Sequence, residues 1–177
     1  MIQAVATQTL RPVTERNHVE NFEKRLFALS KAHDILINEH GGASMRAIVE
    51  SLDETLAMPG RLLIEGPDVM LGPRGALSTG LLMHELGTNA MKYGALSVPE
   101  GIVSVRWSVA EAGGEPRMTL SWNESGGPIP TQPQRKGFGS KLIQMGLIGT
   151  GGVVARYEAP GFSVEMSASL QQLQQAN

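Results

Sequence analysis

The sequence contains no cysteine, no long hydrophobic run and no marked excess of charge of either sign. The absence of cysteine excludes disulfides and thiolate metal sites, and it fits a reducing compartment. No apolar run approaches the ~18 residues of a membrane-spanning helix, and the N-terminus lacks the layout of a signal peptide. Because 15 Lys and Arg stand against 17 Asp and Glu without a basic cluster, we expect a cytoplasmic protein with no nucleic-acid or membrane contact.

Glycine is plentiful, with 21 residues that concentrate in the second half of the chain. Loops that approach a ligand closely use glycine for its missing side chain. A chain of 177 residues can bury one real core. We expect a helical hairpin at 1–40, a main domain at 41–170 and a frayed, Gln-rich tail at 171–177.

The predicted hairpin begins with a helical stretch, residues 1–10, that lacks a capping residue. Its second helix carries apolar side chains at spacings of four and three over about two heptads. These positions are Phe22, Leu26, Leu29, His33 and Leu36. Two such helices form half of a four-helix bundle, which a second copy would complete. A homodimer is one interpretation, and a hairpin folded onto the main domain is the other.

The main domain alternates helical and strand patterns in an order typical of an α+β fold. Helices are expected at 45–56, at 77–97 and from 137 to about 147. Strands are expected at 61–65, 68–71, 103–109, 117–122, 151–158 and 162–168, with a Gly/Pro-rich loop at 125–136. The sequence therefore predicts a two-layer α/β sandwich with a mostly antiparallel sheet, preceded by the helical hairpin.

The stretch 77–97 carries the chemistry of the main domain. On a helix it is apolar or small almost all round, but Glu85, Asn89 and Lys92 fall together on one narrow stripe. A carboxylate can orient or deprotonate a nucleophile, and an amide oxygen one turn further suits Mg²⁺, which takes few protein ligands. Lysine can neutralise phosphate, and the start of the helix at Gly139 offers N–H groups to phosphate oxygens.

The run HELGTNAMKYGAL resembles the N-box of the ATP-binding domain that histidine kinases share with gyrase and MutL, the GHKL type. Its form, with His84 before Glu85 and with Trp122-Asn123-Glu124 ending a strand, resembles the HWE histidine kinases, a subgroup of bacterial sensor kinases. SGGP and GFGSKLI resemble the two glycine boxes of that family. The likeness covers roughly residues 1–168, since IQAVATQT and the 22–36 helix resemble the family's dimerisation and phosphotransfer hairpin.

The resemblance implies ATP and Mg²⁺ as cofactors, with Asn89 as the metal ligand and Glu85 as the catalytic polar residue beside the γ-phosphate. Lys92 and Tyr93 would line the phosphate and nucleotide pocket. Glu124 would accept a hydrogen bond from the adenine amino group, either directly or through a water molecule. The remaining implied nucleotide-binding residues are Gly126, Gly127, Gly137, Gly139 and Ser140. The loop between the glycine boxes would be a short ATP lid.

Two conspicuous side chains also have plainer interpretations. His84 projects away from the Glu85 stripe, which favours a packed, hydrogen-bonded core histidine over a catalytic one. Trp122 is more often a core aromatic residue than an adenine-stacking one.

The resemblance implies a two-component kinase that passes phosphate from ATP to a histidine and on to a response-regulator aspartate. The family's acceptor histidine precedes the stretch that begins here at Met1, so we expect it to lie outside this chain. His33, on the apolar seam, is expected to be structural, and His18 and His40 are weaker candidates still. A scaffold module without ATP and a GHKL ATPase remain alternative hypotheses.

Overall fold

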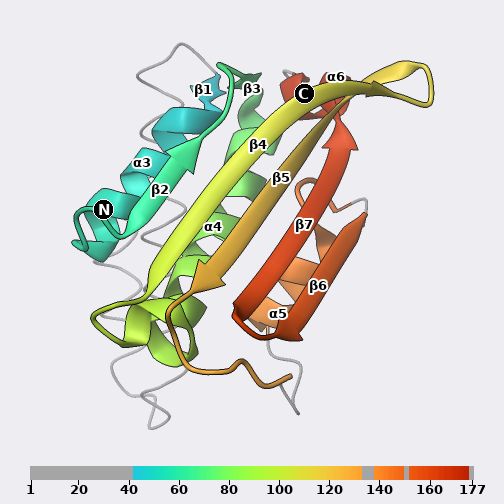
Figure 1. Cartoon of the computed structure of the whole chain (residues 1–177). Coiled ribbons are helices and arrows are strands. Elements are labelled where there is room, and N and C mark those ends of the chain that lie inside the picture. Colours follow the sequence, from blue (N-terminus) through green and yellow to red (C-terminus); the bar gives the residue numbers. More distant parts are fainter. Residues whose placement is uncertain (1–41, 133–137, 150–151, 176–177) are drawn as a thin grey trace, which may run out of the picture.

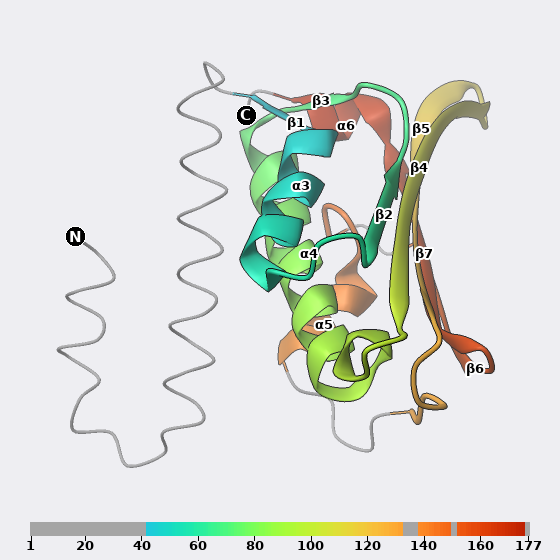
Figure 2. The ribbon, with the colours of Figure 1, turned by 60° about the vertical axis from the view of Figure 1, so that its left-hand side comes forward.

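Helices cover one face of a single five-stranded sheet, so the main domain has two layers (Figures 1 and 2). A computed structural model describes residues 42–132, 138–149 and 152–175. In chain order the elements are β1 (Ala43–Ser44), α3 (Met45–Leu56), β2 (Leu62–Glu65), β3 (Met70–Leu71), α4 (Pro73–Tyr93), the 3-10 turn η1 (Ala95–Ser97), β4 (Ile102–Ala112), β5 (Glu115–Ser125), α5 (Phe138–Met145), β6 (Val153–Glu158), β7 (Gly161–Ser169) and α6 (Leu170–Gln174).

The predicted α+β two-layer sandwich is confirmed. The predicted hairpin of residues 1–40, with its three histidines, lies outside the described residues and stays a prediction. Within the described ranges, no helix has both the length and the apolarity needed to cross a membrane.

The large sheet has the strand order β2-β4-β5-β7-β6. Strand β2 runs parallel to β4, and the other neighbours are antiparallel. The β4–β5 hairpin turns at Gly113 and Gly114, whose φ values of 66° and 82° are of the kind that a tight hairpin turn requires. Because this turn sets the register, both strands extend beyond the predicted 103–109 and 117–122 to eleven residues each.

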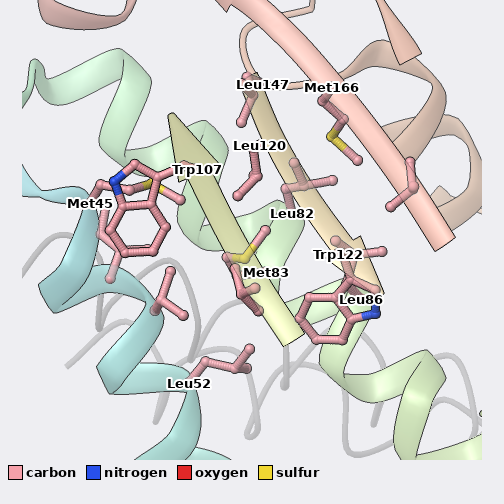
Figure 3. Packing of buried hydrophobic residues seen from close by; sticks show 14 of the residues in the cluster. Met45, Leu52, Leu82, Met83, Leu86, Trp107, Leu120, Trp122, Leu147 and Met166 are labelled. Atoms are coloured by element: carbon pink, nitrogen blue, oxygen red, sulfur yellow. The ribbon is translucent and has the colours of Figure 1, made fainter. Parts of the chain in front are cut away.

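The hydrophobic core fills the space between the sheet and helices α3 and α4 (Figure 3). Alternate residues of β5 point inward, and Leu120 and Trp122 are buried there. Leu82 and Leu86 of α4 belong to the same cluster. A Cβ on Gly87 of α4 would lie 3.0 Å from a methyl of the α3 residue Leu52, so the glycine permits the close packing of these two helices.

Helix α4 begins earlier and ends earlier than the predicted 77–97. It starts at Pro73, where the fixed φ and the missing N–H of proline suit a first helical turn. It ends at Tyr93, and the next residues form η1 instead of a further helical turn. Lys92 and Tyr93 consequently occupy its last turn.

The C-terminal segment is ordered as helix α6 where the sequence predicts a frayed tail. Leu173 is completely buried, and its carbonyl oxygen accepts a hydrogen bond of 2.9 Å from the N–H of Gly72. A Cβ on Gly75 would overlap the same oxygen. The backbone of α6 thus satisfies the start of α4, which has no side-chain cap. The expectation of fraying was wrong for this reason as far as residue 175.

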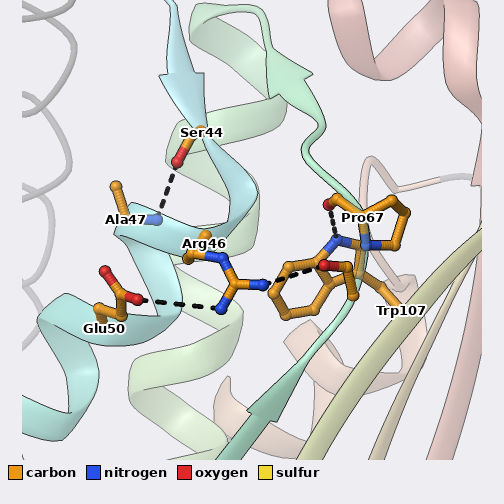
Figure 4. Close-up of polar contacts among 7 residues, drawn as sticks. Ser44, Arg46, Ala47, Glu50, Pro67 and Trp107 are labelled. Atoms are coloured by element: carbon orange, nitrogen blue, oxygen red, sulfur yellow. Dashed lines mark hydrogen bonds and ion pairs between the residues drawn. The ribbon is translucent and has the colours of Figure 1, made fainter.

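Helix α3 is anchored at its N-terminus by polar contacts (Figure 4). The Ser44 hydroxyl accepts a hydrogen bond from the N–H of Ala47, as expected of an N-cap. Arg46 donates to the Gly66 carbonyl at 3.0 Å and lies 5.6 Å from the ring centre of Trp107. The Trp107 indole donates to the Pro67 carbonyl at 2.7 Å, so one cluster joins α3, β4 and the β2–β3 connection.

Replacing Leu173 by alanine tests the docking of α6. Because the side chain is fully buried, we expect Leu173→Ala to lower the free energy of unfolding by about 2–5 kcal/mol in urea denaturation. Leu63→Ala is the matched control, since Leu63 is 50% exposed on edge strand β2, and a loss under about 1 kcal/mol is expected there. Equal small losses in both variants would contradict the packing of α6 against the domain.

Candidate functional site

The predicted polar stripe runs along α4 from a buried position to an exposed one. Glu85 is 8% exposed, Asn89 is half-buried and Lys92 is exposed. Tyr93, the last helical residue, is 72% exposed. The stripe therefore places a sheltered carboxylate at one end and solvent-exposed groups at the other.

The first turn of α5 lies directly against Glu85. A Cβ on Gly139 would overlap Oε2 of Glu85 and would lie 3.4 Å from its carboxyl carbon. Glycine at this position thus lets the backbone of α5 approach the carboxylate. Ser140 follows and is half-buried, whereas Gly137 lies outside the described residues. The structure brings together Glu85 and Gly139 of the second glycine cluster, while their roles in a nucleotide site stay predictions.

Gly126 and Gly127 lie against the segment that follows α4. A Cβ on Gly127 would overlap the Cα of Ala95, and one on Gly126 would lie 2.8 Å from the Glu100 carbonyl oxygen. Gly126 also has a φ of 72°, which side chains rarely adopt. The two residues that follow β5 therefore pack against the segment that follows α4, and this packing leaves no room for side chains on them.

The buried side chain of Glu124, on β5, links the end of this strand to the segment that follows α4. The side chain is only 6% exposed, and its two carboxylate oxygens accept different donors. Oε1 accepts the indole N–H of Trp122 at 3.0 Å, and Oε2 accepts the N–H of Ala95 at 2.7 Å. A Cβ on Gly94 would overlap Oε2. Burial raises the pKa of the Glu124 carboxyl, and the hydrogen bonds from Ala95 and Trp122 partly offset this effect.

Trp122 is completely buried, which confirms its interpretation as a core aromatic residue. The adenine contact predicted for Glu124 remains a prediction. A carboxylate has about four lone-pair sites, so two intramolecular donors leave acceptor capacity for a ligand. His84 is half-buried on α4, and its supporting role also stays a prediction.

The part that sequence reasoning missed is the segment 94–101, called the connector below. The predicted helix 77–97 covered its first half, so no separate function was assigned to it. Two glycines offered a signal, because Gly94 and Gly101 delimit the connector. A Cβ on Gly101 would overlap the carbonyl oxygen of Ala95, which shows how tightly the connector is folded.

No group of three or more His, Cys, Asp or Glu side chains suited to a metal ion occurs among the described residues. The α4 stripe offers the half-buried amide of Asn89 as an oxygen donor for a divalent ion. This donor set fits Mg²⁺, which keeps most of its waters and binds phosphate oxygens together with one or two protein oxygens.

Comparison with known proteins identifies relatives of the chain. The family model described as HWE histidine kinase matches residues 1–68. The chain is 38% identical over 149 residues to a blue-light-activated histidine kinase of Brucella ovis, a match that covers 81% of this chain and 30% of the relative. A protein of the same description from Brucella anthropi is 38% identical over 156 residues, with 84% and 31% covered. The chain thus spans about a third of the length of these relatives.

Solved structures agree on the fold. The histidine kinase domain of the Erythrobacter litoralis EL346 blue-light activated histidine kinase matches with a TM-score of 0.63 at 19% identity, covering 98% of this chain and 83% of that domain. The catalytic domain of the histidine kinase ThkA matches with a TM-score of 0.53 at 12% identity, covering 74% and 97%. The solved structures show the shared fold, and the family model together with the Brucella relatives shows that the chain belongs to the HWE histidine kinase family.

Proposed function

We propose that this chain is the ATP-binding catalytic core of a two-component sensor histidine kinase. It transfers the γ-phosphate of Mg·ATP to a histidine, from which the phosphate passes to an aspartate of a response regulator. That partner implies a cytoplasmic reaction, and the hairpin of residues 1–40 would allow a homodimer.

One observation carries the proposal: one glycine-bearing segment lies against α4 before Asn89, and the other lies against the residues that directly follow α4. Gly139 lies against Glu85, and Gly127 lies against Ala95, just beyond the end of the helix. Tyr93 lies eight positions after Glu85 on the helix, which is about 12 Å at 1.5 Å per residue. A nucleotide along this stretch would have its phosphates near α5 and its base near the Gly126-Gly127 segment.

The side chains divide into a phosphate end and a base end. Glycines and amides at the start of α5 (Gly137, Gly139 and Ser140) would hold phosphate oxygens, helped by the partial positive charge of a helix N-terminus. Lys92 would balance phosphate charge, and Tyr93 would line the pocket. At the base end, Gly126 and Gly127 would let the backbone approach the adenine. Glu124 would accept a hydrogen bond from the adenine amino group.

Asn89 would hold Mg²⁺ through its amide oxygen. The bound ion would neutralise charge on the phosphates. Asn89 suits this task because it is half-buried and lies one turn from Glu85 on the same stripe. A neutral ligand also leaves the triphosphate as the main source of negative charge around the ion.

The chemical step is an in-line displacement at the γ-phosphorus. An imidazole nitrogen of the acceptor histidine forms the new N–P bond, while the bond to the β,γ-bridging oxygen breaks and ADP leaves with that electron pair. Glu85 accepts a hydrogen bond from the other ring N–H and takes up this proton as the imidazole becomes cationic. Its sheltered position strengthens such an interaction, because water competes weakly there.

Isothermal titration of Mg·ATP tests the binding site. We expect Asn89→Ala to weaken binding at least about tenfold, since loss of even an outer-shell partner of a metal has such an effect. Asn123→Ala is the matched control, because Asn123 is an exposed asparagine on β5 and points away from the core. Equal affinity in wild type and Asn89→Ala would remove the metal assignment, and no binding by the wild type would favour the scaffold hypothesis.

Phosphotransfer to a separately supplied acceptor tests the role of Glu85. With radiolabelled ATP and a helix fragment of a family member that carries the acceptor histidine, Glu85→Gln should slow labelling about 100-fold or more. Its affinity for Mg·ATP should stay within about threefold of wild type. Glu65→Gln, on the exposed ion pair with Arg106, should label at the wild-type rate. Steady phosphate release by the wild type without phosphohistidine would instead support the ATPase hypothesis.

A further inference from the structure

The connector, residues 94–101, is held by the guanidinium group of Arg61. Arg61 lies just before β2, is half-buried and donates to three backbone carbonyls of the connector. Nε donates to Gly101 O at 2.8 Å, and Nη2 donates to Ala95 O at 3.2 Å and to Val98 O. One side chain thus joins both ends and the middle of the connector.

The connector's own hydrogen bonds are good only in its first turn, where the N–H and the hydroxyl of Ser97 donate to the Gly94 carbonyl at 3.1 and 2.7 Å. The backbone bonds from Val98 N to Ala95 O and from Gly101 N to Val98 O are both 3.4 Å long, at the weak end of the usual range. Hydrogen bonds to a charged donor are about twice as strong as neutral ones. Beyond the first turn, from Val98 to Gly101, the shape of the connector therefore depends on Arg61 more than on its own backbone.

A carboxylate holds the opposite side of the same segment. Oε2 of Glu124 accepts the N–H of Ala95, the first residue of η1, while Arg61 binds carbonyls at and beyond that turn. A negative group thus meets the N–H end and a positive group meets the carbonyl end, which is the arrangement that the dipole of a helical turn favours. The two charged groups fix the connector between β2 and β5.

This connector is the surface against which the base end of the proposed nucleotide site is built. A side chain on Gly127 would overlap the Cα of Ala95, and a side chain on Gly126 would overlap the carbonyl oxygen of Glu100. Tyr93 immediately precedes the connector. A displacement of the connector would therefore move Gly126, Gly127 and Tyr93 together.

We propose that Arg61 is a positioning residue for nucleotide binding, which acts through the connector and not by touching the nucleotide. The inference rests on the proposed function, because it concerns the base end of the same site. It predicts a loss that is independent of Mg²⁺, since the proposed metal ligand Asn89 and the start of α5 are not among the groups that Arg61 contacts. Loss of Arg61 should therefore affect binding differently from loss of Asn89.

The test measures ADP affinity of the full chain by titration calorimetry, once in excess EDTA and once in Mg²⁺. We expect Arg61→Gln to weaken ADP binding roughly tenfold in both conditions, because several charge-assisted hydrogen bonds are lost and the site is misplaced. The ratio of the two affinities should stay at the wild-type value, whereas Asn89→Ala should lower it. Arg106→Gln is the matched control, because the Arg106 side chain is exposed on β4 and forms an ion pair with Glu65 of β2.

Hydrogen exchange of the nucleotide-free protein supplies a second measurement. Amides 95–101 should exchange faster in Arg61→Gln than in wild type, while those of α3 stay unchanged. Arg61→Lys keeps the charge but replaces the planar fork by one ammonium group, so it should lie between the two. This variant also keeps the inference testable if Arg61→Gln fails to fold.

Several results would overturn the inference. ADP affinity within about twofold of wild type in either Arg61 variant, even with lowered stability, would show that the nucleotide site does not depend on this arginine. A loss confined to the Mg²⁺ condition would place the effect at the phosphate end and contradict the proposed route. If the wild type itself bound no ADP, the proposed function would fail and the inference with it, whereas wild-type binding with unchanged variants would sink the inference alone.

Discussion

Helix α4 is held at both ends by groups from distant parts of the chain, and the proposed site depends on that fixation. At its start, the Leu173 carbonyl of α6 accepts the N–H of Gly72. Just beyond its end, the Glu124 carboxylate accepts the N–H of Ala95. Unsatisfied backbone groups at helix ends are costly when they are buried, so these contacts define where α4 begins and stops. These two hydrogen bonds therefore fix the position of the polar stripe from Glu85 to Lys92.

The burial of Glu124 gives this residue two possible tasks that differ physically. A carboxylate removed from water needs hydrogen-bond donors, and Trp122 and Ala95 supply them within the protein. Its structural task, joining β5 to the end of α4, is complete without a ligand. A contact with adenine would use the lone pairs that remain. The site is therefore shaped before nucleotide binds, which lowers the ordering cost of binding.

The glycines of the site serve close approach more than turning. Gly94, Gly127 and Gly139 each occupy a place where a Cβ would overlap a neighbouring group: the Glu124 carboxylate, the Ala95 backbone and the Glu85 carboxylate respectively. Gly113 and Gly114, in contrast, form an open turn with positive φ and nothing within 4 Å of an added Cβ. A sequence pattern marks both kinds as glycine-rich, and only the three-dimensional neighbours distinguish them. This is why the sequence could propose a role for the second glycine cluster but could not name the atom that Gly139 approaches.

The sequence by itself determined most helices and strands of the main domain and their order, and it proposed the residue types of the site. The periodicity of α3 and α4, the turn at Gly113-Gly114 and the stripe of Glu85, Asn89 and Lys92 are local properties, because they depend on spacing along one helix or strand. The family resemblance in HELGTNAMKYGAL is equally local. Only the tertiary structure decided that α6 docks on the start of α4, that Glu124 is already hydrogen-bonded, and that Arg61 holds the connector through its carbonyls. These contacts join residues from 29 to 40 positions apart, as between Ala95 and Glu124 or Arg61 and Gly101, or still further, as between Gly72 and Leu173. Such pairings arise from the packing of the whole core, and no single stretch of sequence encodes them.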